Sequence, residues 1–241
     1  MNKILTLIPA YNEEQNIAKV ITELKADFSD SDVLVINDCS KDNTLKVLQE
    51  IDANYISTSY NSGYAGALQL GFKYAVAKGY SYVIQFDGDG QHVANQAKKL
   101  YEAAKDTDSD IIIGSRFLKK TNYKHSFFRK VGTKLFSLLI RMINRVKISD
   151  PTSGFQILNR KTFTHYSKMG NFPEYPDANL LIAMLLDGYK VSEVSVQMRE
   201  REFGESMHGG IIKPIKYMIK MIYSIFVILF IRFMKIFQIR K

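Results

Sequence analysis

Residues 82–92 read Tyr-Val-Ile-Gln-Phe-Asp-Gly-Asp-Gly-Gln-His, an apolar run followed by an acidic, glycine-rich turn. The apolar run predicts a buried strand, and the turn places Asp87 and Asp89 one residue apart at its carboxyl end. Two such carboxylates can reach one hard cation, which prefers oxygen ligands and keeps positions open for phosphate oxygens. The carboxyl ends of parallel strands are also where α/β sheets bind ligands. In isolation this sequence would be an ordinary turn, so its meaning depends on the flanking segments.

Strand and helix patterns alternate through the first 115 residues. The apolar runs predict strands at 4–8, 33–36, 55–58, 82–86 and 110–114. The helical spacings between them predict helices at 13–25, 42–51, 65–78 and 93–105. The second half predicts a basic amphipathic helix at 127–146, strands at 155–158 and 191–198, and helices at 178–186 and over the last 30 residues. This order predicts an α/β fold, Rossmann-like, with a mostly parallel central sheet flanked by helices.

Basic residues are concentrated in two apolar segments of this 241-residue chain. Residues 111–149 hold ten Lys/Arg and residues 207–241 hold seven, and neither contains Asp or Glu. Basic tracts indicate a polyanion or a membrane surface, and their Ile, Leu, Phe and Met content favours the membrane over nucleic acid. The alternative is a solvated basic face plus a core helix. We therefore expect a soluble domain at 1–208 and a membrane-associated helical segment at 209–241.

Composition and cysteine content narrow the class of protein further. Hydrophobic residues make up 46% and charged residues 24%, which excludes disorder, collagen and coiled coil as global descriptions. The one cysteine, Cys39, cannot form an internal disulfide, and residues 1–9 run directly into a strand pattern without a signal peptide. We therefore expect the chain to lie on the reducing, cytosolic side of a membrane.

Three more predicted strands end in ligand-type residues. After the first strand, Tyr11 and Glu13 are candidates to hold a base and ribose, although an acidic first turn also starts a helix well. After the second, Asp38 could accept hydrogen bonds from a base or ribose, or belong to another helix cap. Residues 61–67 read Asn-Ser-Gly-Tyr-Ala-Gly-Ala, and glycines such as Gly66 allow a backbone to approach a ligand closely. The spacing is not that of a dinucleotide-binding loop.

In chain order these motifs are P-A-Y-N-E, N-D-C-S-x-D-x-T, N-x-G-x-x-G-A and D-x-D-x-Q-H. Together they resemble the family 2 glycosyltransferases of the GT-A fold, in particular the dolichol-phosphate mannosyltransferase and bacterial polyprenyl-phosphate sugar synthase group. The similarity continues through residues 114–117, 150–155 and 201–206 and spans roughly 3–208. Two positions depart from the pattern: Asn37 replaces the first Asp of an Asp-Asp pair, and Met207 stands where a Lys often follows Gly-Glu-Ser.

The resemblance implies a site at these strand ends. The residues it assigns to the nucleotide are Pro9, Tyr11, Glu13, Ile36, Asp38, Gly66 and Asp87. Those it assigns to Mg²⁺ or Mn²⁺ on the donor diphosphate are Asp87, Asp89 and Gln91. Those it assigns to the acceptor phosphate are Arg116, Arg129, Thr133 and Arg201. The implied partners are a nucleotide-sugar donor, a polyprenyl-phosphate acceptor and the cytoplasmic face of the cell membrane, with no nucleic acid; a small membrane-protein partner or a homo-oligomer is left open.

The expected reaction is an inverting transfer in which Asp89, Arg116 and Asp177 are the catalytic candidates. A phosphate acceptor is already anionic and needs fixed cations rather than a base. A sugar hydroxyl would need a base, and Asp177 is the candidate, its alternative role being the N-cap of the helix at 178–186. Extension of a lipid-linked or cell-wall glycan is therefore one alternative function, and a non-catalytic, membrane-bound nucleotide-binding protein is another. His92 either contacts the donor or is a surface histidine.

The C-terminal helix has a longest uncharged run, 221–231, of eleven residues, short of the roughly 20 that span a bilayer. On a helical wheel Lys213, Lys216, Lys220 and Ser224 fall on one side, with Ile, Phe, Met and Leu opposite. This pattern favours a helix lying in the membrane interface over a spanning one.

Overall fold

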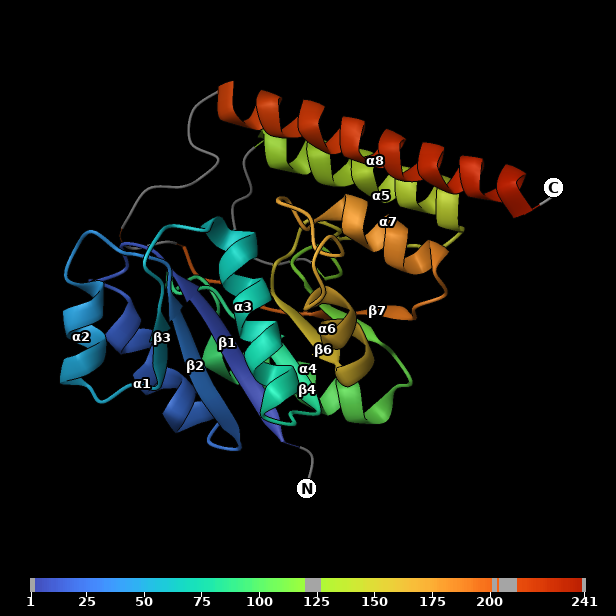
Figure 1. Ribbon diagram of the computed structural model, residues 1–241. Coiled ribbons are helices and arrows are strands. Elements are labelled where there is room, and N and C mark those ends of the chain that lie inside the picture. Colours follow the sequence, from blue (N-terminus) through green and yellow to red (C-terminus); the bar gives the residue numbers. More distant parts are fainter. Residues whose placement is uncertain (1–2, 120–126, 201–202, 204–211, 240–241) are drawn as a thin grey trace.

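The computed structural model describes residues 3–119, 127–200, 203 and 212–239 (Figure 1). In this part of the chain seven strands form one mixed sheet of order β3-β2-β1-β4-β6-β5-β7. The strands are β1 Ile4–Ala10, β2 Ser31–Asn37, β3 Tyr55–Ser57, β4 Tyr82–Gln85, β5 Ile111–Ser115, β6 Gln156–Asn159 and β7 Val191–Ser195. All pairings are parallel except those of β6, which is antiparallel to β4 and β5. The predicted α/β fold is confirmed, and the reversed β6 is the feature that the sequence pattern did not predict.

Helices cover both faces of the sheet. They are α1 Ile17–Asp27, α2 Thr44–Glu50, α3 Gly63–Ala77, α4 Ala94–Asp106, α5 Phe127–Asn144, α6 Arg160–Tyr166, α7 Ala178–Leu186 and α8 Ile212–Ile239. The short helix α6 was not predicted. It begins at Asn159, whose side chain accepts a hydrogen bond from the backbone N–H of Thr162. The expected boundary between residues 208 and 209 lies outside the described residues.

The apolar strands have two buried faces because side chains alternate along a strand. In β1, Leu5 and Leu7 pack in the cluster that contains α3, α6 and α7, while Ile4 and Ile8 pack with α1 and α4 on the other face. This explains the near-continuous apolar runs. The polar residues that follow the parallel strands β1, β2, β4 and β5 lie at the carboxyl edge of the sheet.

Helices α5 and α8 lie side by side above α7 (Figure 1). Met221 and Ile225 of α8 are buried with Phe136 and Ile140 of α5 in the core cluster that includes α7. Many of the side chains exposed on the two helices are large and apolar, beside basic ones such as Lys134 and Lys220. The large apolar ones are Val131, Leu138 and Met142 of α5 and Ile219, Ile222, Tyr223, Phe226, Phe230, Ile231, Phe233 and Met234 of α8.

One helix in the described part of the chain is long and apolar enough to cross a membrane. It is the Lys216–Met234 part of α8, with a mean hydropathy of 1.8. Two of its polar residues contact the body of the protein: Ser224 accepts a hydrogen bond from Asn179 of α7 at 2.8 Å, and Lys220, although exposed, donates to the Tyr175 hydroxyl at 3.2 Å. The helix is therefore docked along the body of the protein by a partly polar face.

Candidate active site

The loops after β1 and β2 are joined by side chain to backbone hydrogen bonds. The Asn12 N–H donates to Ser40 Oγ at 3.0 Å, and Asn12 Oδ1 accepts from the Lys41 N–H at 2.8 Å. The Glu13 N–H donates to Thr44 Oγ1 at 2.8 Å. Asn12 has a left-handed backbone (φ 58°), which asparagine tolerates better than most residues. These bonds fix the backbone that directly follows Tyr11 at the carboxyl edge.

The residues expected at the base and ribose lie together at this edge, with different exposures. Tyr11 is 41% exposed, so its ring is open to a ligand, and Pro9 is partly buried beside the loop after β4. Glu13 accepts a hydrogen bond from Asn16 Nδ2 at 2.8 Å. Ile36 is fully buried in the core, so its side chain lies beneath this surface.

Asp38 organises the start of α3. Its carboxylate accepts hydrogen bonds from the Ser62 N–H at 2.8 Å, the Ser62 hydroxyl at 2.7 Å and the Gly63 N–H at 2.7 Å. A Cβ on Gly66 would lie 2.6 Å from the Ser62 Cβ, so the glycine makes room for this cap rather than for an open space. The role of Asp38 toward a base stays a prediction, and the structure shows its carboxylate bound to the protein's own backbone.

The Asp-Gly-Asp loop packs against the first loop. Gly88 lies close to the Pro9 carbonyl oxygen, which would be 3.4 Å from a Cβ at this position. Asp89 Oδ1 accepts from the Gln91 N–H at 3.0 Å. Asp87 Oδ1 accepts from the Tyr64 hydroxyl at 3.2 Å. The loop therefore holds both carboxylates by contacts on several sides.

His92 is buried beneath this loop, so the expectation of a surface histidine was wrong. Its Nδ1 accepts from the Asp87 N–H at 2.9 Å, and its Nε2 lies 3.5 Å from Asp87 Oδ2. The ring stacks on Phe155, with centroids 4.4 Å apart. The imidazole thus supports Asp87 from below, because its apolar contacts fix the ring while both nitrogens face the same residue.

Tyr64 connects the acidic residues of the site. Burial and the neighbouring charges of Asp87, Asp177 and Asp89 raise the pKa of its hydroxyl well above the ordinary tyrosine value. The phenol therefore stays a neutral hydrogen-bond donor among carboxylates. A Cβ on Gly154 would lie 2.9 Å from its oxygen, so this glycine allows the hydroxyl to reach Asp87. Tyr64 was not among the predicted site residues, although it stands within the motif at 61–67.

The acidic loop suits a divalent cation that also takes ligands from a substrate. In the described residues no group of three or more His, Cys, Asp and Glu side chains is gathered as a metal site. Asp87 and Asp89 provide two carboxylates, and the negative charges of both raise the pKa of the nearby Tyr64 hydroxyl. Such a pair fits a hard cation whose remaining positions are filled by phosphate oxygens and water. The backbone of Gln91 is held against the segment after β7, because its carbonyl accepts a hydrogen bond from the Arg199 N–H at 2.8 Å.

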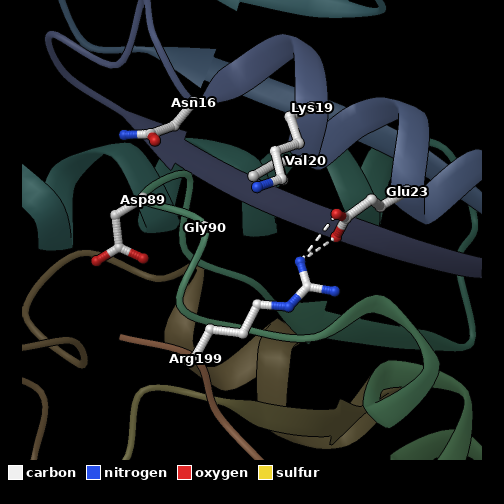
Figure 2. Close-up of a pocket in the computed structure, with 7 residues that line it drawn as sticks. All are labelled: Asn16, Lys19, Val20, Glu23, Asp89, Gly90 and Arg199. Carbon is white, nitrogen blue, oxygen red and sulfur yellow. Dashed lines mark hydrogen bonds and ion pairs between the residues drawn. The ribbon is translucent and has the colours of Figure 1, made fainter. Parts of the chain in front are cut away.

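A small hollow lies behind this loop (Figure 2). It is lined by Asn16, Lys19, Val20, Glu23, Asp89, Gly90 and Arg199. Across it, Arg199 donates to both carboxylate oxygens of Glu23 at 2.7 and 2.8 Å. This ion pair ties the segment after β7 to α1, and in Figure 2 the Asp89 carboxylate lies apart from it. The loop is thereby held between α1 and the chain that follows β7.

Arg116, which follows β5, is fixed in a buried ion pair. Its Nε and Nη2 donate to the two oxygens of Asp150 at 2.7 and 2.8 Å, and Nη2 also contacts the Thr152 carbonyl at 3.2 Å. The hydroxyl of Thr152 lies 3.4 Å from that of Thr133 in α5. Two expected phosphate ligands, Arg116 and Thr133, are therefore brought together through Thr152.

The loop that carries Asp150 is itself anchored from the edge strand. Glu193 of β7 accepts from the Ser149 N–H at 2.7 Å and from the Asp150 N–H at 2.9 Å. Asp150 and Glu193 were not predicted as site residues, although Asp150 opens a motif of the resemblance. Of the other expected phosphate ligands, Arg129 lies in α5 without a described side chain, and Arg201 lies outside the described residues.

Asp177 occupies the N-cap position of α7, as expected, but its side chain makes no capping hydrogen bond. Its Oδ2 instead accepts from the Tyr217 hydroxyl of α8 at 2.6 Å. Burial raises the pKa of Asp177 to about 6; the Tyr217 hydrogen bond and Arg116 oppose this effect, while Asp150 and Asp87 add to it. Asp177 therefore lies within the electrostatic field of the acidic loop and of the Arg116–Asp150 pair.

The seven-stranded sheet with its acidic loop at the carboxyl edge has the architecture of GT-A glycosyltransferases. Residues 6–166 match the model of the family described as Glycosyl transferase family 2, and the chain belongs to this family. The predicted enzyme class is confirmed: the protein is a glycosyltransferase of the hexosyltransferase type.

Two curated relatives match nearly the whole chain. An undecaprenyl-phosphate mannosyltransferase of Micrococcus luteus is 29% identical, over 87% of this chain and 89% of that protein. A UDP-N-acetylglucosamine–dolichyl-phosphate N-acetylglucosaminyltransferase of Methanococcus voltae is 25% identical, over 83% of this chain and 87% of that protein. Their names share a polyprenyl-type phosphate acceptor and differ in the sugar.

A solved structure shows the same fold. Glucosyl-3-phosphoglycerate synthase of Mycobacterium tuberculosis, crystallised with Mn²⁺, uridine diphosphate and phosphoglyceric acid, aligns with a TM-score of 0.64 at 17% identity. The alignment covers 96% of this chain and 78% of that one.

Proposed function

We propose that this glycosyltransferase moves a sugar from a nucleotide-sugar donor to a polyprenyl phosphate at a membrane surface, with inversion at the anomeric carbon. The observation that carries the proposal is the position of Arg116. Asp150 holds this buried cation at the same sheet edge as Asp87 and Asp89, and Thr152 links it to α5. A fixed cation between an acidic loop and an apolar helix pair suits an acceptor with a phosphate head and a hydrocarbon tail.

The donor is proposed to lie along the ends of β1, β2 and β4. Tyr11 is exposed there and can stack on a base, and the backbone that follows it is fixed by the bonds to Ser40 and Thr44. The diphosphate would face Asp87 and Asp89, with Gln91 beside them. When bound there, Mg²⁺ or Mn²⁺ would act as a Lewis acid that stabilises the charge of the departing diphosphate.

The acceptor phosphate needs no deprotonation, because it is anionic at neutral pH. Its attack requires position and charge compensation, which Arg116 and Thr133 supply in this proposal, with Arg129 and Arg201 as the further expected ligands. Since Asp150 orients the guanidinium through two hydrogen bonds, the cation does not have to be ordered when the acceptor arrives. Attack on the anomeric carbon opposite the leaving diphosphate gives inversion.

The membrane contact is proposed to be made by the exposed apolar side chains of α5 and α8. Met221 and Ile225 of α8 are buried against the body, so the helix lies along the domain and its opposite face is turned outward. This favours a helix lying in the interface, as the sequence predicts, over one that leaves the domain to span the bilayer. We place this contact at the cytosolic face of the cell membrane.

A second candidate acceptor is a sugar hydroxyl. The observation that favours it is Asp177, whose pKa of about 6 leaves it largely ionised at neutral pH while it is still basic enough to accept a proton. In that case Asp177 would be the general base and the product would be an extended glycan.

The test is a transfer assay that separates these acceptors. Purified protein is mixed with Mn²⁺, a panel of labelled UDP- and GDP-sugars, and either undecaprenyl phosphate or a lipid-linked sugar with its phosphate blocked. We expect label in a mild-acid-labile lipid monophosphate product. Label only in the glycan of the second acceptor would replace the proposal by the alternative.

A further inference from the structure

Helix α8 contacts the edge of the site as well as the hydrophobic core. The Tyr217 hydroxyl donates to Asp177 Oδ2 at 2.6 Å, and the rings of Tyr217 and Tyr175 meet edge to face with centroids 6.0 Å apart. One turn along, Lys220 donates to the Tyr175 hydroxyl at 3.2 Å and lies 3.8 Å from Glu174. The short segment 174–177 is therefore held by α8 at both of its ends.

The same segment faces the reacting part of the site. The ionisable groups that act electrostatically on or with Asp177 come from five different elements or loops. They are Tyr217 of α8, Arg116 after β5, Asp150 before β6, Asp87 after β4 and Tyr64 of α3. A movement of the Asp177 carboxylate would thus change the field at both the acceptor cation and the acidic loop.

We infer that Tyr217 is a positioning residue of the transferase: its hydroxyl fixes the Asp177 carboxylate and so couples the seating of α8 to the acceptor end of the active site. The inference deepens the proposed function, because it gives α8 a part in turnover as well as in membrane contact. The outward face of the helix meets the lipid in that proposal, and its inward face carries Tyr217. A helix whose two faces serve these two contacts links membrane docking to the charge beside Arg116.

The chain offers a matched control for this hydrogen bond. Tyr80 donates from its hydroxyl to Asp32 Oδ2 at 2.7 Å, the same chemical pair at nearly the same distance. Asp32 lies near the start of β2, at the amino edge of the sheet and away from the site. Tyr80→Phe and Tyr217→Phe each remove one tyrosine–aspartate hydrogen bond, so a merely structural role predicts the same consequences for both.

The experiment compares steady-state transfer by wild type, Tyr217→Phe and Tyr80→Phe in vesicles containing undecaprenyl phosphate, with KM for each substrate measured from pH 5 to 8. We expect Tyr217→Phe to lose about three- to tenfold in kcat/KM for the acceptor, with the donor KM unchanged. The hydroxyl favours the ionised carboxylate, so its loss should also move the Asp177-linked inflection of the pH profile upward. Tyr80→Phe should change neither property. Equal behaviour of the two variants would overturn the inference.

The outcome can be told apart from a failure of the proposed function. If wild type uses a sugar hydroxyl and not the lipid phosphate, the acceptor proposal is wrong. Tyr217→Phe and Tyr80→Phe are then compared with the hydroxyl acceptor, and a positioning role predicts a fall in kcat for Tyr217→Phe alone. A readout without turnover is the pH midpoint of the Asp177-linked change in thermal stability. We expect Tyr217→Phe to raise this midpoint. In an Asp177→Asn background, Tyr217→Phe should leave the pH dependence of thermal stability unchanged. A midpoint that stays in place would refute the positioning role.

Discussion

The guanidinium of Arg116 and the carboxylate of Asp150 form a two-point ion pair, 2.7 and 2.8 Å long, from which water is almost excluded. Asp150 is fully buried and Arg116 is 8% exposed. The pair joins the end of β5 to the loop before β6, so it closes the sheet edge where the one antiparallel strand of the described sheet enters. A pair in this position has consequences for both stability and activity.

Removing one partner should be costly because it leaves the other charge buried. We expect Asp150→Ala to lower the free energy of unfolding by about 3–5 kcal/mol. The control is Asp108→Ala, which removes the partner of Lys190 from an ion pair on the surface, where the loss should stay below about 1 kcal/mol. Urea unfolding followed by circular dichroism measures both. Equal losses would contradict a buried, uncompensated arginine in the first variant.

The acidic loop should be needed for chemistry and not for folding. We expect Asp89→Ala to reduce transfer by at least about a hundredfold, since it removes an oxygen ligand of the proposed cation. EDTA should do the same to wild type, and added Mn²⁺ should restore only the wild type. Asp106→Ala, an exposed acid at the end of α4, is the control for a change of charge. Activity of Asp89→Ala in EDTA would rule out the metal-assisted reaction.

Asp177 should make stability depend on pH. Burial raises its pKa from 3.8 to about 6, so folding favours the protonated form. That contribution is fully present below pH 4 and is lost as the pH rises through 6, to a total of about 3 kcal/mol. Asp177→Asn should therefore be more stable than wild type at pH 8 and no more stable at pH 4. Thermal unfolding at the two pH values tests this, and an equal difference at both would show that the carboxyl titrates normally.

Membrane binding should depend on the outward face of α8. Deleting 209–241 would also remove Met221 and Ile225 from the core, so substitutions on the exposed face are the cleaner test. Phe226→Glu with Phe230→Glu should weaken binding to vesicles of phosphatidylglycerol and phosphatidylcholine by at least about a hundredfold. Met169→Glu, at an exposed apolar residue after α6, should have no effect. If the double variant sediments with vesicles as the wild type does, another part of the protein makes the membrane contact.

The sequence predicted the layers and the strand ends of this fold because local periodicity carries that information. The bounds of α7 are as expected, and most other elements differ by only a few residues. Strand β6 is antiparallel to both of its neighbours, β4 and β5. The periodicity of a sequence carries no information about which strands pair or in which direction they run. Helix α6 begins at the residue directly after the end of β6, so no turn in the sequence separates the helix from the strand.

Within the site, the residue types were predictable but their partners were not. Asp38 was expected to face a ligand or to belong to a helix cap, and its carboxylate accepts from backbone N–H groups at the start of α3, more than 20 positions later. Asp177 was expected to cap α7 or to act as a base, and it meets Tyr217, 40 positions away. Both contacts depend on tertiary structure, so a motif can show that an acid belongs to the edge of the sheet without showing which group it binds.

The acceptor class should be decided by comparing charge-removing substitutions at saturating donor. If the acceptor is a lipid phosphate, its charge must be met by fixed cations, and we expect Arg116→Gln, Arg129→Gln and Arg201→Gln each to cost roughly ten- to a hundredfold in kcat/KM for the acceptor. Asp177→Asn should cost less, on the order of the three- to tenfold expected for Tyr217→Phe, because an ionised phosphate has no proton to lose. A hydroxyl acceptor reverses the order, since the base would then be indispensable and the arginines secondary. Binding of UDP and GDP with Mn²⁺, measured by calorimetry, checks that each variant keeps its donor site. An Asp177→Asn enzyme that folds and binds its nucleotide yet does not turn over would refute the phosphate acceptor and establish the glycan-extending alternative.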